Sequence, residues 1–162
     1  TRLPDGAALM VIRMGHHDPS DFDSRTTVQY GHDGIMTSLI KDPLLAVHGF
    51  VFVNNFEGAT LANTDIKVPT SISSALNKCM PVRVNSINFV NPPWVIRLVI
   101  PVVKTVLSAK LASRLNVILD AAELPGVLSI SQEDLPTELG GQVEVDDPVG
   151  VLQIMVAENI VV

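Results

Sequence analysis

The chain has 162 residues, a net charge of −6 and one cysteine, which fits a single domain that needs no disulfide. Hydrophobic residues make up 47% of the sequence and charged residues 17%, whereas soluble domains carry about 25% charged residues. The apolar excess indicates a ligand cavity, a membrane-facing patch or the surface for a missing partner. The sequence contains no run of about 18 apolar residues, the length that predicts a membrane-spanning helix.

Charges are segregated along the chain. Between residues 66 and 119 every charged residue is basic, and after Arg114 every charged residue is acidic. An anionic membrane surface attracts a basic, apolar-rich segment, although chance clustering in a short chain gives the same pattern. The acidic C-terminal part argues against nucleic acid as the main partner. The single Cys79 indicates a reducing compartment, so we expect a cytoplasmic protein.

Apolar periodicity predicts alternating strands and helices. Strands are expected at residues 7–14, 49–54, 82–90 and 114–119. Helices are expected at residues 25–40, 70–80 and 94–113, the last with a kink or break near Pro101. Residues 126–131 and 135–141 are expected to be loops. The alternation predicts an α/β fold with a parallel-rich sheet covered by helices.

Helix boundaries are indicated by specific residues. Asp23 or Ser24 is expected to cap the first helix, and Asp42-Pro43 to end it. Pro69 suits the first turn of the second helix.

The sequence contains no motif of a common enzyme or dinucleotide site. G-x-G-x-x-G, the Walker loop and G-x-S-x-G are all absent. Cys79 lies on the apolar face of an expected helix, where a thiol usually packs inertly. His16, His17 and Asp18 are adjacent in one loop, a pattern that favours solvated side chains over a metal site. We therefore expect no enzyme activity, no metal and no cofactor.

Residues 94–107 form a helix that is apolar on most of its circumference. At about 100° per residue, Arg97, Lys104 and Ser108 fall in one narrow stripe. One interpretation is a central core helix. The other is a movable lid with one apolar face on a ligand and the other on a membrane or the core. Trp94, close to Arg97 and Lys104, suits an anchor at the level of lipid headgroups.

Two smaller features have alternative interpretations. His32 lies one helical turn before Ile35, so it either lines a pocket as its one polar contact or is a half-exposed helix histidine. Arg83, Lys110 and Arg114 either meet at one sheet edge and bind a phosphate or are scattered surface charges.

Four segments, in order, resemble motifs of CRAL-TRIO lipid-binding domains. Residues 81–93 (PVRVNSINFVNPP) resemble the signature strand, and residues 49–58 (GFVFVNNFEG) resemble the strand and turn ahead of it. Residues 107–111 (LSAKL) with Arg114, and residues 135–141 (LPTELGG), resemble the later motifs. The chain is most similar to the cellular retinaldehyde-binding and alpha-tocopherol transfer branch.

The resemblance implies a sheet floor and a mobile helical gate over an apolar pocket that holds one lipid. Phe50, Phe52, Ile87 and Phe89 match the floor, and residues 94–107 match the gate. With the apolar face of the first helix, the expected ligand-binding residues are His32, Ile35, Met36, Leu39, Phe50, Phe52, Ile87, Phe89, Val95, Val99, Ile100, Val103, Val106 and Leu107.

The branch also implies a basic cleft beside the gate for a phosphoinositide headgroup. Arg83 and Arg114 match its positions, and Lys110 is the third residue that we expect there. The position at which the branch has a second basic residue on this strand is occupied by Asn85 in this chain.

We expect residues 1–141 to form the lipid-binding domain and residues 142–162 a tail, in which 149–156 adds a strand or covers an apolar patch. Such proteins usually carry an N-terminal helical subdomain, so a partial chain is expected. The expected function is to bind one small hydrophobic ligand of the tocopherol, retinoid or phospholipid class in a closed pocket. The protein then transfers the ligand between membranes and is peripheral at them. The alternative is a phosphoinositide-sensing interaction or regulatory module without ligand transfer.

Overall fold

The computed structural model describes residues 2–20, 23–65, 67–78, 80 and 82–144. The expectations for Cys79 and for residues 149–156 therefore lie outside the described residues.

Four strands form one parallel sheet, in which each strand lies beside the next along the chain. The strands are β1 (Ala8–Arg13), β2 (Phe50–Asn55), β3 (Val84–Val90) and β4 (Leu115–Ile118). All four lie within the expected ranges except for Asn55 at the end of β2. The expected α/β fold with a parallel sheet is confirmed.

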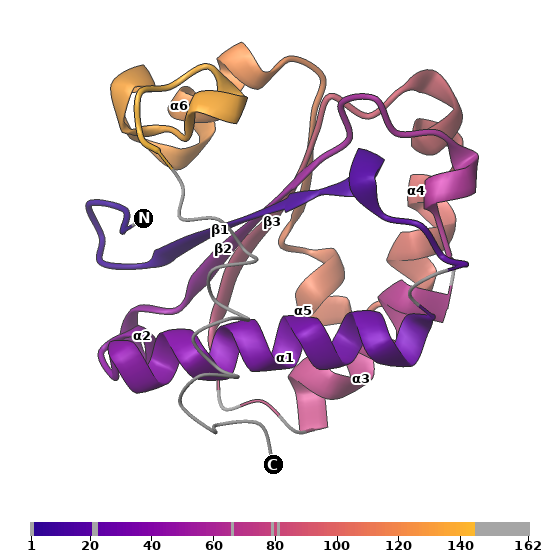
Figure 1. Cartoon of the computed structure of the whole chain (residues 1–162), viewed down its shortest axis with the longest axis horizontal. Coiled ribbons are helices and arrows are strands. Elements are labelled where there is room, and N and C mark those ends of the chain that lie inside the picture. Colours follow the sequence, from indigo (N-terminus) through magenta and orange to yellow (C-terminus); the bar gives the residue numbers. More distant parts are fainter. Residues whose placement is uncertain (1, 21–22, 66, 79, 81, 145–162) are drawn as a thin grey trace.

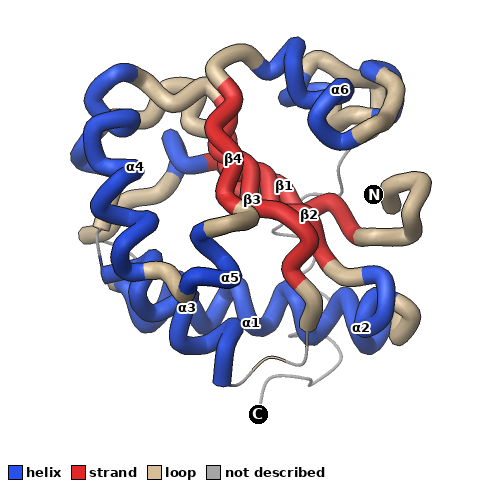
Figure 2. Tube along the Cα trace, turned by 180° about the vertical axis from the view of Figure 1, so that it is seen from behind, coloured by secondary structure: helices blue, strands red, loops and turns tan. Residues whose placement is uncertain are grey.

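Helices cover both faces of this sheet. They are α1 (Ser24–Lys41), α2 (Leu45–His48), α3 (Lys67–Lys78), α4 (Trp94–Val106), α5 (Ala109–Ala112) and α6 (Leu124–Leu128). Figures 1 and 2 show α1, α3, α4 and α5 on one face of the sheet and α6 on the other. Successive parallel strands joined by crossovers of one hand place the connecting helices on the same face, which explains this arrangement.

Short polar side chains set the starts of α1 and α3. Asp23 is the N-cap of α1, and its carboxylate accepts a hydrogen bond from Thr26 N at 2.7 Å. α3 begins at Lys67, earlier than the sequence predicted, and the carboxylate of Asp65 accepts a hydrogen bond from Lys67 N at 2.8 Å. Pro69 therefore lies within the first turn, where its missing N–H leaves no hydrogen bond unmade.

The sequence predicted a kink or break near Pro101. The break is wrong, because α4 continues through this residue to Val106, and the kink stays a prediction. Pro101 is exposed, so water can reach the main chain on that side of the helix. The break comes instead at Leu107, whose backbone is extended, and at Ser108, whose hydroxyl caps α5 by accepting from Leu111 N.

The two sheet faces build separate parts of the core. Phe50 and Phe52 of β2 face the layer of α1, and Phe52 is in register with Ile87 of β3. The alternate residues Val51 and Val53 face the opposite layer. β2 is thus covered on both faces, as its apolar sequence predicted.

Residues 126–131 and 135–141 were expected to be loop-like with a short turn, and this expectation is wrong for residues 126–128, which are helical. Residues 124–128 form α6, whose Leu124 is fully buried. Leu135 and Leu139 pack against the same face of the sheet. Short 3₁₀ turns connect this layer and the loops: Met14–His16, Leu61–Asn63, Ala121–Glu123, Gln132–Asp134 and Thr137–Leu139.

Candidate functional site

The inner face of α4 lies on the floor residues of β3. Ile100 and Val103 are buried and pack with Leu115 of β4. Further members of this cluster are the predicted ligand residues Ile87, Phe89, Val99 and Leu107. α4 therefore covers β3, one of the two strands that the sequence assigned to the floor.

The floor residues of β2 belong to a second cluster under α1. Phe50 and Phe52 pack with Ile35 and Leu39 of α1, and the two ring centroids lie 6.2 Å apart. Phe50 and Ile35 are buried in this packing. The predicted ligand residues thus share one sheet face but divide between a cluster under α1 and another under α4.

Three predicted ligand residues lie at the margins of these clusters. Val95 packs with Phe56 and Phe89, whose rings meet edge to face at 5.0 Å between centroids. Met36 of α1 and Val106 of α4 are half-buried.

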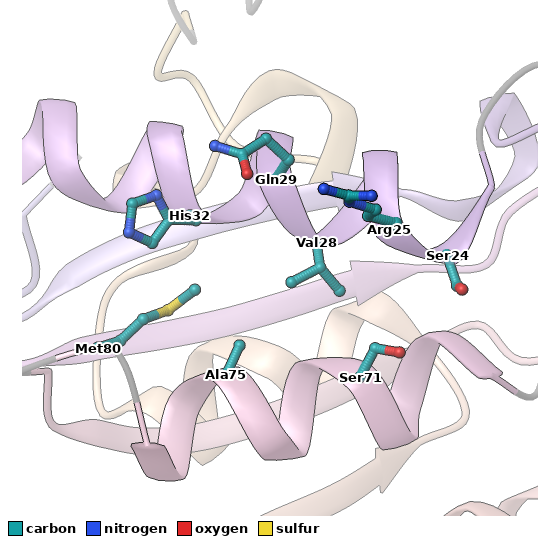
Figure 3. A pocket seen from close by; sticks show the side chains of 8 residues that line it. All are labelled: Ser24, Arg25, Val28, Gln29, His32, Ser71, Ala75 and Met80. Carbon is teal, nitrogen blue, oxygen red and sulfur yellow. The ribbon is translucent and has the colours of Figure 1, made fainter. Parts of the chain in front are cut away.

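A cleft of about 330 Å³ lies between α1 and α3 (Figure 3). Of the predicted ligand residues, His32 lines it. The lining residues come from α1, α3 and the chain just after α3: Ser24, Arg25, Val28, Gln29, His32, Ser71, Ala75 and Met80. Sequence reasoning missed the α3 side, although the four-residue spacing of Ser71 and Ala75 places both on one helix face.

The outer face of α4 is also apolar. Trp94 and Leu98 are each 67% exposed and Val102 is 50% exposed, and the spacing of four residues aligns them in one stripe. Arg97 and Lys104 are exposed beside this stripe. The inner face of α4 is therefore core, and its outer face is an apolar surface exposed among the described residues. The movable lid stays a prediction.

A polar contact holds the C-terminal end of α4. Ser73 of α3 is buried, and its hydroxyl accepts a hydrogen bond from Ser108 N at 3.1 Å. Asn77 donates to Ser73 O at 2.7 Å. The junction between α4 and α5 is thus fixed to α3.

The predicted phosphoinositide residues lie around the start of β3. The Arg114 guanidinium donates to Val84 O, so it lies beside the residue that follows Arg83. Arg83 and Lys110 are exposed, and Arg114 is half-buried. The contact places Arg114 near the Arg83 segment, and Lys110 lies one helical turn before Arg114.

Metal ligands and membrane-spanning helices are the remaining candidate features. Among the described residues, no three His, Cys, Asp or Glu side chains cluster as a metal site, and no helix there is long and apolar enough to cross a membrane.

Hydrogen bonds from the Ser20 hydroxyl and N–H lower the pKa of Asp18. Several contacts lower the pKa of Asp23, and the hydrogen bond from Thr26 N has the largest effect.

The chain is similar to part of each of several known proteins. Clavesin-2 from Rattus norvegicus and from Homo sapiens are each 31% identical over 110 residues, covering 65% of this chain and 33% of the relative. Clavesin-1 from Mus musculus is 29% identical over 107 residues, covering 64% of this chain and 30% of the relative. The match spans about a third of the length of these relatives.

A crystal structure of Sfh5 is similar over 68% of this chain and 43% of that chain, with 16% identity and a TM-score of 0.47. Residues 4–141 match the CRAL/TRIO domain. This match covers the sheet, the helices on both of its faces and the motifs identified from sequence. The chain therefore belongs to the CRAL/TRIO domain family.

Proposed function

We propose that this chain binds one small hydrophobic ligand in a closed pocket beneath α4 and transfers it between membranes. The ligand is of the tocopherol, retinoid or phospholipid class, and the protein works in the cytoplasm and peripherally at membranes. The observation that carries this proposal is that α4 is apolar on both sides: Ile100 and Val103 are buried against the sheet, while Trp94 and Leu98 are exposed.

This two-sided helix suits a gate that opens at a bilayer. In water, lifting α4 would expose Ile100 and Val103 and lose the free energy of their burial. At a membrane the outer stripe enters the apolar phase, and lipid replaces the contacts that the inner face loses. The membrane thus lowers the free energy of opening, and the ligand leaves where an acceptor phase is present.

A reversible lock on α4 tests this mechanism. Because the Ser73 hydroxyl lies 3.1 Å from Ser108 N, a Ser73→Cys/Ser108→Cys pair is positioned for a disulfide between α3 and the end of α4. The assay follows fluorescent tocopherol, retinoid and phospholipid analogues as they move from donor to acceptor vesicles. We expect transfer to stop on oxidation and to recover on reduction, with the wild-type chain, which keeps Cys79, as the control. Equal transfer in both redox states would contradict the gate.

A second candidate function is a phosphoinositide-sensing module without ligand transfer. The hydrogen bond from Arg114 to Val84 O supports it, because Arg114 then lies beside the segment that carries Arg83, at the start of β3. Each basic side chain near an anionic surface contributes about 1 kcal/mol. An Arg83→Ala/Lys110→Ala variant is therefore expected to bind phosphoinositide vesicles about 30-fold more weakly, and it keeps the Arg114 contact.

The matched control is Lys41→Ala/Lys67→Ala, which removes two exposed charges from α1 and α3. Uptake of an apolar ligand is measured for both variants. The sensing module requires that the Arg83 and Lys110 variant loses vesicle binding and retains uptake. Equal vesicle binding by the two variants would remove this candidate.

A further inference from the structure

The cleft between α1 and α3 has polar groups at both ends and an apolar middle (Figure 3). Ser24, Arg25 and Ser71 lie at one end. Val28 and Ala75 face each other across the middle, and Met80 lies at the other end beside His32. The cleft involves no residue of α4, the gate of the proposed function, and it shares one predicted ligand residue, His32.

The two polar ends differ in what they can offer a ligand. Gln29 Nε2 donates to a carboxylate oxygen of Asp33 at 2.9 Å, and His32 Nδ1 lies 3.0 Å from the same oxygen. Gln29 and His32 at the Met80 end therefore each already contact Asp33. A ligand head at that end would also face the Asp33 carboxylate.

Arg25 at the opposite end forms no ion pair within the described part of the chain. The nearby Asp23 carboxylate accepts from Thr26 N in capping α1. The charge of Arg25 interacts with that of Asp23. Its guanidinium presents five N–H donors and can bind a carboxylate or phosphate through two parallel hydrogen bonds. The Ser24 and Ser71 hydroxyls add neutral donors at the same end.

Size restricts the rest of the ligand. The cleft volume of about 330 Å³ is at the lower end of the range of about 300–1,000 Å³ for small-molecule pockets. This volume suits one apolar chain and is small for a lipid with two. The flexible thioether of Met80 can adjust to the end of such a chain.

We propose that the α1–α3 cleft binds a single-chain amphiphile with an anionic head. The head lies at Arg25, Ser24 and Ser71, and the chain runs between Val28 and Ala75 toward Met80. Carboxylate and phosphate heads share the chemistry that Arg25 recognises.

Calorimetric titration of the whole chain tests this site with dodecanoate and dodecyl phosphate, each below its micelle concentration, and with neutral 1-dodecanol below its solubility limit. We expect one anionic amphiphile per chain. Arg25→Gln is expected to weaken the binding of the two anions about tenfold and to leave the binding of dodecanol unchanged. The control Arg97→Gln on α4 is expected to change the affinity for none of the three probes. Tighter dodecanoate or tighter dodecyl phosphate identifies the preferred head, and either supports the proposal.

A second pair of variants tests the path of the chain. Ala75→Leu fills the middle of the cleft and should weaken all three probes at least tenfold, while Ser74→Leu at the exposed neighbouring position of α3 should not. Acetate and inorganic phosphate should not bind at the same concentrations. The proposal is overturned if no anionic probe binds, if head-only anions bind equally well, or if dodecanoate binds both the Arg25 and Ala75 variants like wild type. Failure here would leave the proposed function intact, because that function depends on α4.

Discussion

The substitution Leu98→Ser tests the outer face of α4 as a membrane-binding surface. Full burial of a leucine side chain contributes about 1.5–3 kcal/mol. Leu98 is 67% exposed, so about two thirds of that free energy, about 1–2 kcal/mol, remains available for transfer into a bilayer. Losing it should weaken vesicle binding about 5- to 30-fold. The folded state should be little affected, since this side chain makes few contacts in the free protein.

The assay is co-sedimentation with large vesicles that contain anionic lipid, over a range of lipid concentrations. Leu119→Ser is the matched control, because Leu119 is 56% exposed and lies outside α4. Thermal unfolding of both variants checks that the fold is retained. If the Leu98 and Leu119 variants bind vesicles equally well, the stripe does not enter the bilayer and the reasoning for a two-sided gate is wrong.

Three further predictions concern the fold that supports the site. Ile100→Ala should lower the free energy of unfolding by about 2–5 kcal/mol, because Ile100 is 6% exposed; a loss under 1 kcal/mol in urea titration would place this side chain outside the core. Gly49→Ala should destabilise the fold, since Gly49 has φ +87° and a Cβ there would lie 2.5 Å from a main-chain carbonyl oxygen. Gly31→Ala in α1 should stabilise the fold by about 0.5–1 kcal/mol, because a Cβ there meets nothing within 4 Å. Equal melting temperatures of the two variants would contradict this. The lowered pKa of Asp23 stabilises the fold above the ordinary value of 3.8, and this contribution is lost as the pH falls through the lower folded-state pKa. Asp23→Asn should therefore reduce the pH dependence of unfolding below pH about 4, and an unchanged pH profile would refute the assignment.

The strands and the main helices were predictable because local pattern and tertiary packing agree. The run from Phe50 to Val53 is apolar on both faces, and the sheet does bury both. Asp23 was one of two expected caps, and its short side chain reaches Thr26 N.

The errors fall where packing overrides a local rule. Pro101 predicted a break, but its exposed position lets water satisfy the main chain, so α4 continues. The helix ends before Ser108 instead, where Ser108 N donates a hydrogen bond to the hydroxyl of Ser73 in α3. The local sequence around Ser108 does not reveal this contact, because α3 is distant along the chain. α6 was missed because Pro125 and Gly126 make the segment resemble a loop, while burial of Leu124 stabilises a short helix there.

The candidate site was predictable to a similar degree. Ile100 and Val103 of the predicted ligand set do lie on the buried face of α4, and the family motifs assigned the floor strands; the contact of these residues with a ligand stays a prediction. The α1–α3 cleft was missed on its α3 side, because the pairing of Ser71 and Ala75 with α1 is set by how two helices pack. Sequence spacing within one helix does not reveal which partner its face meets.

Native mass spectrometry of the purified chain, followed by organic extraction, tests the central claim that this protein carries a hydrophobic ligand. The account predicts one hydrophobic molecule per chain, either co-purified or taken up from a mixed panel of tocopherol, retinoid and phospholipid. A bare protein mass after incubation with the whole panel would contradict it, and the apolar residues beneath α4 would then be core alone.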